Sequence, residues 1–222
     1  MGQLLLSKNV GTVSKFEPDK FRELLVAAIV MHDLPFCFVE YTAIRAIFSS
    51  LCPEATIITR NTARADLIKM HGREKEKIKF MLKDASSRIS LTSDLWTSII
   101  TDGYICITAH FIDRNWVLQK RVLNFCFMPP PRNGVSLYEK MYNLLCEWEI
   151  ENKVFSVTLD NASSNDVFVD ILRTQLSIRK ALVCNGEFFH FRCYAHILNL
   201  IVQDGLKEID IAIQKIQKVL NM

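Results

Sequence analysis

The first part of the chain carries hydrophobic residues at helical spacing, divided by prolines into separate segments. Pro18 stands in the first turn of the first segment, where a missing N–H is tolerated. That segment ends before Pro35, because proline disfavours the α conformation in the residue before it. Helices are therefore predicted over residues 18–34, 41–51 and 62–84. They form a small helical region, 17–86, preceded by an aperiodic segment, 1–16, that we expect to be disordered.

From residue 88 the pattern changes to runs rich in β-branched and aromatic residues, which is typical of strands. Polar turn residues at 101–103 and 113–115 separate the first runs and are short enough for antiparallel hairpins. Strands are predicted over 89–95, 104–112, 117–128, 154–159 and 188–193. Helices are predicted over 135–149, 167–176 and 195–220, with Gly205 expected to interrupt the last.

The order of these elements predicts the fold class. Three antiparallel strands, a crossover helix and a strand returning parallel to the first is the RNase H type of order, and it places the fourth strand beside the first. The prediction is an α/β protein: an RNase H-like mixed five-stranded sheet with flanking helices over residues 87–222, preceded by the small helical region. Asp94 and Asp160 would then face one cleft.

Composition narrows the class of protein only slightly. The 222 residues are 50% hydrophobic, as in an ordinary folded protein, and the net charge of +3 permits nucleic-acid binding without requiring it. The seven cysteines are odd in number and lack the spacing of a disulfide framework, which indicates a reducing compartment. The apolar run at 24–31 is far shorter than the roughly 20 residues of a membrane-spanning helix, so no membrane segment is expected.

Asp94 and Asp160 are the strongest candidates for chemistry, because each follows an apolar, strand-like run. Two carboxylates at neighbouring strand ends can bind Mg²⁺ and leave positions for water and phosphate, as phosphoryl transfer requires. Taken singly, each residue has a simpler explanation: Asp94 as a turn residue and Asp160 as a helix N-cap.

A second cluster has the spacing of zinc ligands and consists of Cys184, His190, Cys193 and His196. Alternation along a strand points His190 and Cys193 to opposite faces, so no zinc site is expected. The tryptophans lie in apolar patterns and are expected to pack in the core rather than to stack on bases: Trp96, Trp116 and Trp148.

Four sequence blocks together are similar to one known family. They are Thr92-Ser93-Asp94-Leu95-Trp96-Thr97-Ser98, His110-Phe111-Ile112-Asp113, Leu159-Asp160-Asn161-Ala162-Ser163-Ser164-Asn165, and Phe189 to Gln203, which contains Cys193-Tyr194-Ala195-His196. In this order they closely resemble hAT superfamily transposases of the plant Ricesleeper type. The resemblance covers nearly the whole chain, since residues 16–51 also resemble the helical region that precedes the catalytic core in that family.

The resemblance implies an RNase H-like core with a DDE metal site, in which Asp94 matches the first acid and Asp160 the second. It implies DNA as partner and a nuclear location. Arg132, where the family more usually has histidine, keeps a cation for DNA phosphate but removes the ligation or proton transfer of an imidazole. Arg192 and His196 are further candidates for phosphate contact, although the Cys193–His196 pair is expected mainly to hold the strand-to-helix junction.

Other parts of the family pattern have no match, so a truncated member is expected. No Cys-x-x-Cys with paired histidines matches the BED zinc finger, and the third acid has no counterpart. Asp204, Glu208 and Asp210 lie on the expected wet side of an amphipathic helix and are unsuited to replace it. We therefore expect weak binding of one Mg²⁺ and little or no strand cleavage.

Two classes of function remain open. One is a transposase-derived, DNA-associated protein with an incomplete core and no small-molecule cofactor. The other is a domesticated structural or interaction protein, or a gene remnant, without DNA binding of its own. The apolar stripe expected over residues 206–220 would favour self-association or binding of protein partners in either case.

Overall fold

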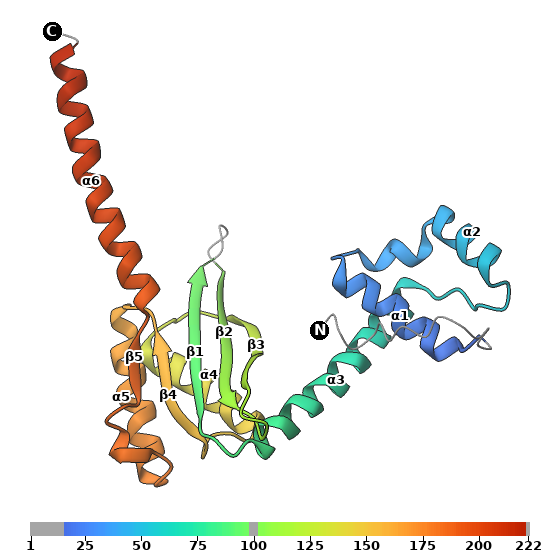
Figure 1. Cartoon of the computed structure of the whole chain (residues 1–222), viewed down its shortest axis with the longest axis horizontal. Coiled ribbons are helices and arrows are strands. Elements are labelled where there is room, and N and C mark those ends of the chain that lie inside the picture. Colours follow the sequence, from blue (N-terminus) through green and yellow to red (C-terminus); the bar gives the residue numbers. More distant parts are fainter. Residues whose placement is uncertain (1–15, 98–101, 221–222) are drawn as a thin grey trace. The chain divides into compact units, whose positions relative to one another are not determined.

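The computed structural model describes residues 16–97 and 102–220, with only the backbone described at 96–97, 163–164 and 211–220. The chain divides into two compact units, Met1–Lys77 and Ile78–Met222, and each is described by itself (Figure 1). The division falls within one helix, α3 (Arg60–Asp84). The segment predicted to be disordered, 1–16, lies outside the described residues except for Phe16. No helix among the described residues is long and apolar enough to cross a membrane.

The first unit is helical, as the proline-divided pattern predicts. Its elements are α1 (Pro18–Met31), a 3₁₀ helix η1 (Phe36–Glu40), α2 (Thr42–Leu51) and the larger part of α3. A small core holds them together and consists of Leu25, Ile29, Val39, Ile58 and Ala63.

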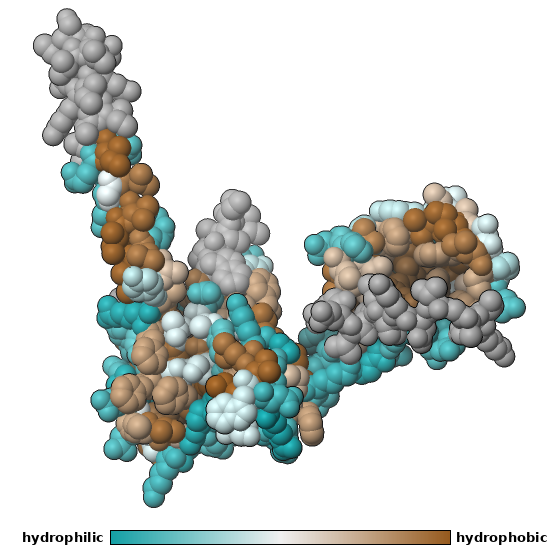
Figure 2. Space-filling view, viewed as in Figure 1, coloured by the Kyte–Doolittle hydropathy of each residue, from teal (hydrophilic) through white to brown (hydrophobic). Residues whose placement is uncertain are grey.

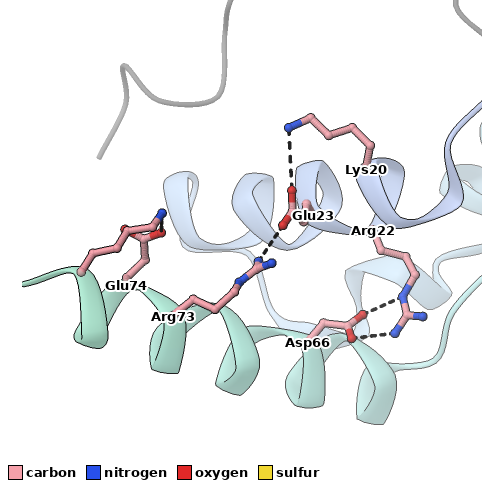
Figure 3. A network of polar contacts seen from close by, with 7 residues as sticks. Lys20, Arg22, Glu23, Asp66, Arg73 and Glu74 are labelled. Atoms are coloured by element: carbon pink, nitrogen blue, oxygen red, sulfur yellow. Dashed lines mark hydrogen bonds and ion pairs between the residues drawn. The ribbon is translucent and has the colours of Figure 1, made fainter.

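Ion pairs connect α1 with α3 beside this core (Figure 3). The Arg22 guanidinium donates two hydrogen bonds to the Asp66 carboxylate, at 2.9 and 2.6 Å. Arg73 lies 2.6 Å from Glu23, which also pairs with Lys20 at 3.7 Å. The polar residues of α3 therefore form a partly solvated face that also contacts α1.

The second unit contains the predicted sheet. Its strands are β1 (Ile89–Thr97), β2 (Gly103–Ile112), β3 (Leu118–Met128), β4 (Val154–Leu159) and β5 (His190–Arg192). Its other elements are α4 (Gly134–Glu147), α5 (Ser163–Ile178), a 3₁₀ helix η2 (Val183–Gly186) and α6 (Tyr194–Leu220). The strand order is β3-β2-β1-β4-β5. It confirms the predicted RNase H-like α/β fold.

Pairing across the sheet is antiparallel from β3 to β1 and parallel from β1 to β5. In the parallel β1–β4 pair, Ser90 lies opposite Ser156 and Thr92 opposite Thr158. The hydroxyl of Ser156 donates to that of Ser90 over 3.1 Å, which connects the two strands through their side chains as well. This pairing fixes the relative positions of the residues that come next along β1 and β4.

One face of the sheet forms the main hydrophobic core. Alternate residues of the central strands, such as Leu91, Ile107 and Val157, are less than 2% exposed and pack with buried residues of α4 and α5. Figure 1 shows α4 behind the sheet on this side. The covered face therefore supplies most of the unit's apolar burial, the dominant favourable term in folding.

The opposite side of the sheet, here called the open face, carries the remaining alternate residues. Small polar side chains occupy its centre: Ser90, Thr92, Thr108, Ser156 and Thr158. The imidazole Nε2 of His110 lies 3.1 Å from the Thr92 hydroxyl. Burial and the nearby charge of Lys120 lower the pKa of His110 below its usual value. Within the described residues, the hydrophobic core lies on the other side.

Lys153, just before β4, closes the end of α3. Its ammonium donates to the carbonyl oxygens of Leu82, Lys83 and Ala85, at 2.9, 2.6 and 2.9 Å. The last carbonyls of a helix have no partner within the helix, and a positive charge there is favourable. One side chain thus ties the entry of the fourth strand to the helix that precedes the first.

Four local predictions are wrong. Gly205 does not interrupt α6, which is continuous from Tyr194 to Leu220, because a solvated glycine weakens a helix by only about 1 kcal/mol relative to alanine. The fifth strand is limited to His190–Arg192, and α5 begins four residues earlier than predicted, at Ser163. Trp116 is 87% exposed in the β2–β3 turn, where φ is 61°, whereas Trp148 is buried as expected. The side chain of Trp96 lies outside the described residues.

Replacement of Lys153 by methionine should lower the free energy of unfolding of the second unit by about 1.5–3 kcal/mol, because hydrogen bonds from a charged donor are lost and carbonyl groups are left unpaired. Urea denaturation followed by tryptophan fluorescence measures the change. Lys83→Met is the matched control, because the Lys83 side chain lies at the same helix end and is exposed to solvent. Equal stabilities of the two variants would contradict the assigned role.

Acid should destabilise the second unit through His110. Its pKa in the folded protein lies below the unfolded value of about 6.5, so the unfolded state binds more protons as the pH falls through that value. We expect the free energy of unfolding to decrease between about pH 7 and pH 5, and to decrease less in His110→Gln, which has no titrating ring. Parallel pH profiles of the two proteins would rule out this contribution.

Candidate functional site

Asp94 and Asp160 come from neighbouring parallel strands at the same end of the sheet. Asp94 lies in the second half of β1, and Asp160 directly follows the last residue of β4. Thr92 pairs with Thr158, so Asp94 and Asp160 each stand two residues beyond a paired position. Because side chains two residues apart on a strand share a face, Asp94 continues the polar row of the open face. Asp160 lies beyond the end of β4 and lines a small pocket together with residues of the main hydrophobic core.

The two carboxylates differ in their surroundings. Asp94 is exposed, and within the described residues no hydrogen bond or ion pair engages its side chain. Asp160 is half-buried, and its Oδ1 accepts a hydrogen bond from Asn165 Nδ2 at 2.5 Å and another from the backbone N–H of Ala162 at 3.2 Å. One acid is thus held in position, and the other is free to meet a ligand.

Asn165 is the residue that sequence reasoning missed. It is 7% exposed in the first turn of α5, and its amide also donates to the Asp160 backbone carbonyl at 3.2 Å. The beginning of α5 therefore positions the carboxylate that follows β4. Asn165 ends one of the sequence blocks that resemble the family and stands two residues before the predicted helix, and neither signal assigns it a role without the fold.

The neighbouring Asn161 supplies a further oxygen. Its side-chain Oδ1 is buried and has no hydrogen-bond partner in the described part of the chain. A buried oxygen without a donor carries a desolvation cost, which a cation or an ordered water can remove. Carboxylate and amide oxygens are the ligand types that Mg²⁺ accepts, so the donor chemistry of Asp94, Asp160 and Asn161 fits this ion.

The concave space beside these residues is small. A pocket of about 10 Å³ is lined by Ser93, Leu95, Ile105, Leu137, Met141, Leu159, Asp160, Asn165 and Phe168. That volume is at the lower limit for a single water molecule.

The three predicted phosphate-binding residues lie at the same end of the sheet. Arg132 follows β3, donates through Nε to the Met128 carbonyl at 3.1 Å, and covers Gly103, where an added Cβ would lie 2.2 Å from Nε. Arg192 ends β5, is 61% exposed in its side chain and lies 4.0 Å from Asp166. His196 is half-buried in the first turn of α6. Arg132 is thus packed into the fold, whereas Arg192 presents a largely solvated cation.

The other candidate ligands do not assemble. In the described part of the chain, no group of three or more His, Cys, Asp or Glu side chains is placed to hold a metal ion. This statement includes Asp204, Glu208 and Asp210, which are exposed along α6. It also includes the Cys184–His196 set, in which burial lowers the pKa of His190. Among the described residues, Asp94 and Asp160 therefore have no third His, Cys, Asp or Glu ligand beside them.

Comparison with known protein families gives two adjoining matches. Residues 92–188 match the ZBED1 RNase-like domain, and residues 191–222 match the ZBED1 RNase-like helical domain. The first match begins in β1 and includes Asp94 and Asp160. The second begins in β5 and includes α6, so both matches lie in the second unit.

Curated relatives match over nearly the whole chain. It is 40% identical over 227 aligned residues to the putative AC transposase of Zea mays, covering 98% of this chain and 28% of that protein. It is 34% identical to zinc finger BED domain-containing protein RICESLEEPER 2 of Oryza sativa subsp. japonica, covering 91% of this chain and 28% of that protein. It is 30% identical to zinc finger BED domain-containing protein DAYSLEEPER of Arabidopsis thaliana, over 90% of this chain and 29% of that protein.

The chain thus spans less than a third of the length of these relatives. The RNase H-like sheet, the two domain matches and the relatives agree with one another, and the chain belongs to the hAT-type transposase-like proteins.

Proposed function

We propose that this chain is a transposase-derived, DNA-associated protein whose RNase H-like unit binds DNA phosphate and one divalent cation at Asp94 and Asp160, with little or no strand cleavage. The observation that supports the proposal is that both acids lie at the same end of two paired parallel strands, each two residues beyond the paired Thr92 and Thr158. A nuclear location follows from this role, because the partner is chromosomal DNA.

The cation would supply charge neutralisation for a phosphate. Asp94 and Asp160 would hold it, with Asn161 Oδ1 as a further oxygen donor. Asn165 would keep Asp160 in place through its 2.5 Å hydrogen bond. Arg192, largely solvated at the end of β5, would add a positive charge near the bound phosphate.

Cleavage needs more than this pair provides. Two-metal phosphoryl transfer stabilises both the attacking and the leaving oxygen, and it needs enough carboxylates to hold two ions. The described residues bring only two acids together at the strand ends. We infer that the 222-residue chain binds DNA without cleaving it.

A second candidate function rests on α6. Its described part exposes Leu198, Ile201, Val202, Leu206 and Ile209 by 44–61% each. These positions follow helical spacing and form one apolar stripe, and Figure 2 shows hydrophobic residues gathered along the described part of this helix. Exposed apolar patches of this kind mark protein interaction sites, so an interaction protein without DNA binding is the alternative.

Divalent-ion binding should depend on both acids. Titration of Mn²⁺ followed by electron paramagnetic resonance, with Mg²⁺ as competitor, should show affinity weakened at least about tenfold in Asp94→Asn and in Asp160→Asn, a loss that even outer ligand partners usually cause. Asp170→Asn on α5 is the control, as an exposed acid away from the strand ends. Ion binding that all three variants retain would show that the acids are not ligands.

DNA binding separates the two candidate functions. The proposed role predicts an affinity for duplex DNA whose logarithm falls linearly with the logarithm of salt concentration, by about 0.9 for each phosphate contacted. Fluorescence anisotropy measures this affinity. Arg192→Gln should reduce the slope of the salt dependence by about 0.9, the contribution of one phosphate contact. Absence of binding at low salt, together with a concentration-dependent mass that Val202→Asp abolishes, would favour the interaction protein.

A further inference from the structure

The turn between β2 and β3 carries an exposed apolar surface. Trp116 is 87% exposed in this turn, and beside it Leu118 is 70%, Val117 51% and Ile112 38% exposed. Ile112 pairs with Leu118 at the end of the two strands, so the four residues are neighbours around one turn. We call them the hairpin patch. Exposed apolar residues grouped around a tryptophan are typical of a protein contact.

The turn is held in one conformation by Asp113. Its carboxylate accepts hydrogen bonds from the backbone N–H groups of Asn115 and Val117, at 2.9 and 3.0 Å, and from Gln119 Nε2 at 2.6 Å. Trp116 donates its N–H to the Asp113 carbonyl at 3.0 Å and has a φ of 61°, a conformation uncommon for a bulky residue. Such strain persists where surrounding bonds enforce it. A preformed turn loses little conformational entropy on binding, so it presents Trp116 as an anchor.

The charge around the hairpin patch is unbalanced. Lys120 is exposed two residues after Leu118, on the same face of β3, and it forms no ion pair within the described residues. The charge of Arg114 is balanced by Asp84. Both oxygens of the Asp113 carboxylate are occupied by the turn itself. The patch therefore has an uncompensated cation at its rim, which suits an acidic partner.

The described part of α6 has the complementary surface. Its apolar stripe includes Ile201 and Leu206, which are 61% and 53% exposed. Glu208 follows Ile201 by seven residues and Asp210 follows Leu206 by four, and these helical spacings place an acid at each border of the stripe. Both acids are exposed, and neither forms an ion pair in the described part of the chain. An apolar stripe bordered by acids complements an apolar patch bordered by a cation.

A single chain does not cover the hairpin patch with its own helix. β4 and β5 run parallel to β1, whereas β2 runs antiparallel to it. The β2–β3 turn therefore lies at the end of the sheet opposite to the end at which β5 finishes and α6 begins. Both surfaces are exposed. A second copy of the chain carries both of them, so it is a partner with the required chemistry.

A protein surface suits the hairpin patch better than DNA does. Affinity for DNA comes mainly from several Lys and Arg side chains on phosphates, and the rim of the patch carries a single unbalanced cation. Interfaces between proteins instead combine apolar anchor residues at the centre with a polar rim. The hairpin patch and the stripe of α6 both have this composition.

We propose that the hairpin patch of one chain docks on the apolar stripe of α6 in a second copy, and that two copies exchange this contact in a closed dimer. Each copy contributes one patch and one helix, so two-fold symmetry makes the contact twice. Trp116 is the anchor, and Lys120 faces Glu208 and Asp210. The contact uses none of the residues proposed to hold DNA or the cation, so it goes beyond the proposed function and gives α6 a defined partner.

Sedimentation of the full 222-residue chain over a range of concentrations measures the dimer. Trp116→Asn keeps a residue that tolerates positive φ, and Val202→Asn removes apolar surface of the stripe without adding charge. Each should weaken the dimer at least about 30-fold, the loss caused by removing one anchor residue. Ile178→Asn is the matched control, because Ile178 is an apolar residue 73% exposed at the end of α5. Circular dichroism verifies that each variant is folded.

Mixing Trp116→Asn with Val202→Asn tests the contact directly. Each variant alone damages both contacts of its dimer, whereas the mixed dimer has one contact between an unchanged patch and an unchanged helix. The second contact carries both substitutions, and residues that touch do not lose their energy twice. The mixture should therefore associate at least about 5-fold more tightly than either variant alone, a coupling within the usual range for residues in contact.

Charge reversal tests the choice of α6 as the docking surface. Lys120→Glu places an acid against Glu208 and Asp210, so it should weaken the dimer more than Lys120→Gln does, and most strongly at low salt. Equal effects of the two substitutions would remove the charge complementarity and overturn the assignment.

Other outcomes also overturn the inference. A parent chain that remains monomeric at all concentrations does so, as does a Trp116→Asn dimer as tight as the parent, which would indicate association through the helices alone. A mixture no tighter than its components excludes the contact between patch and helix. If Trp116→Asn weakens DNA binding and leaves the mass unchanged, the patch is a DNA contact. Ion binding at Asp94 and Asp160 is measured separately, so failure of the proposed function is distinguishable from failure of the dimer.

Discussion

The parallel pairing of β1 with β4 is the constraint on which the rest of the second unit depends. It places Ser90 opposite Ser156 and Thr92 opposite Thr158, and a hydroxyl–hydroxyl bond of 3.1 Å joins the first of these pairs. A slip of one residue would reverse the face of every side chain on one strand. The apolar residues of that strand would then leave the core. Hydrophobic burial on one face thus secures the polar arrangement on the other.

The connections around this pair serve the same arrangement. Parallel strands need a crossover, and α4 provides it on the covered face. Lys153 ties the residue before β4 to the last carbonyls of α3, and Asn165 ties the residue after β4 to the start of α5. β4 is therefore held at both ends by polar side chains, while its middle is held by apolar packing. A short strand with fixed ends is a suitable support for a carboxylate that must keep its position.

Membership of the hAT-type transposase-like proteins accounts for the fold and for the blocks around the acids, and it places this chain beside much longer relatives. The functional proposals rest instead on surfaces of this chain. Asp94 and the row of hydroxyl groups belong to the open face, and the apolar stripe of α6 forms a separate surface. The proposed DNA binding and the alternative protein association would therefore use different residues, and substitutions can distinguish them.

The sequence by itself determined the elements and their order. Period-two runs, prolines and polar turns located all five strands and the main helices to within a few residues, and the βββαβ order was enough to place β4 beside β1. It also singled out Asp94 and Asp160 as candidates, because each follows an apolar run and lies in a block that resembles the family. The misplaced features, such as the start of α5, the continuity of α6 at Gly205 and the exposure of Trp116, depend on solvent and packing that no local pattern records.

Tertiary structure alone decided the rest, because strand pairing brings together residues far apart in the chain. Asn165 gained its role only when the start of α5 met the end of β4, and Arg132 lost much of its freedom when it packed over Gly103. Tyr104 and Phe125 are 21 positions apart and look like ordinary core residues in the sequence. The register of β2 with β3 stacks their rings on the sheet face that the main core does not cover.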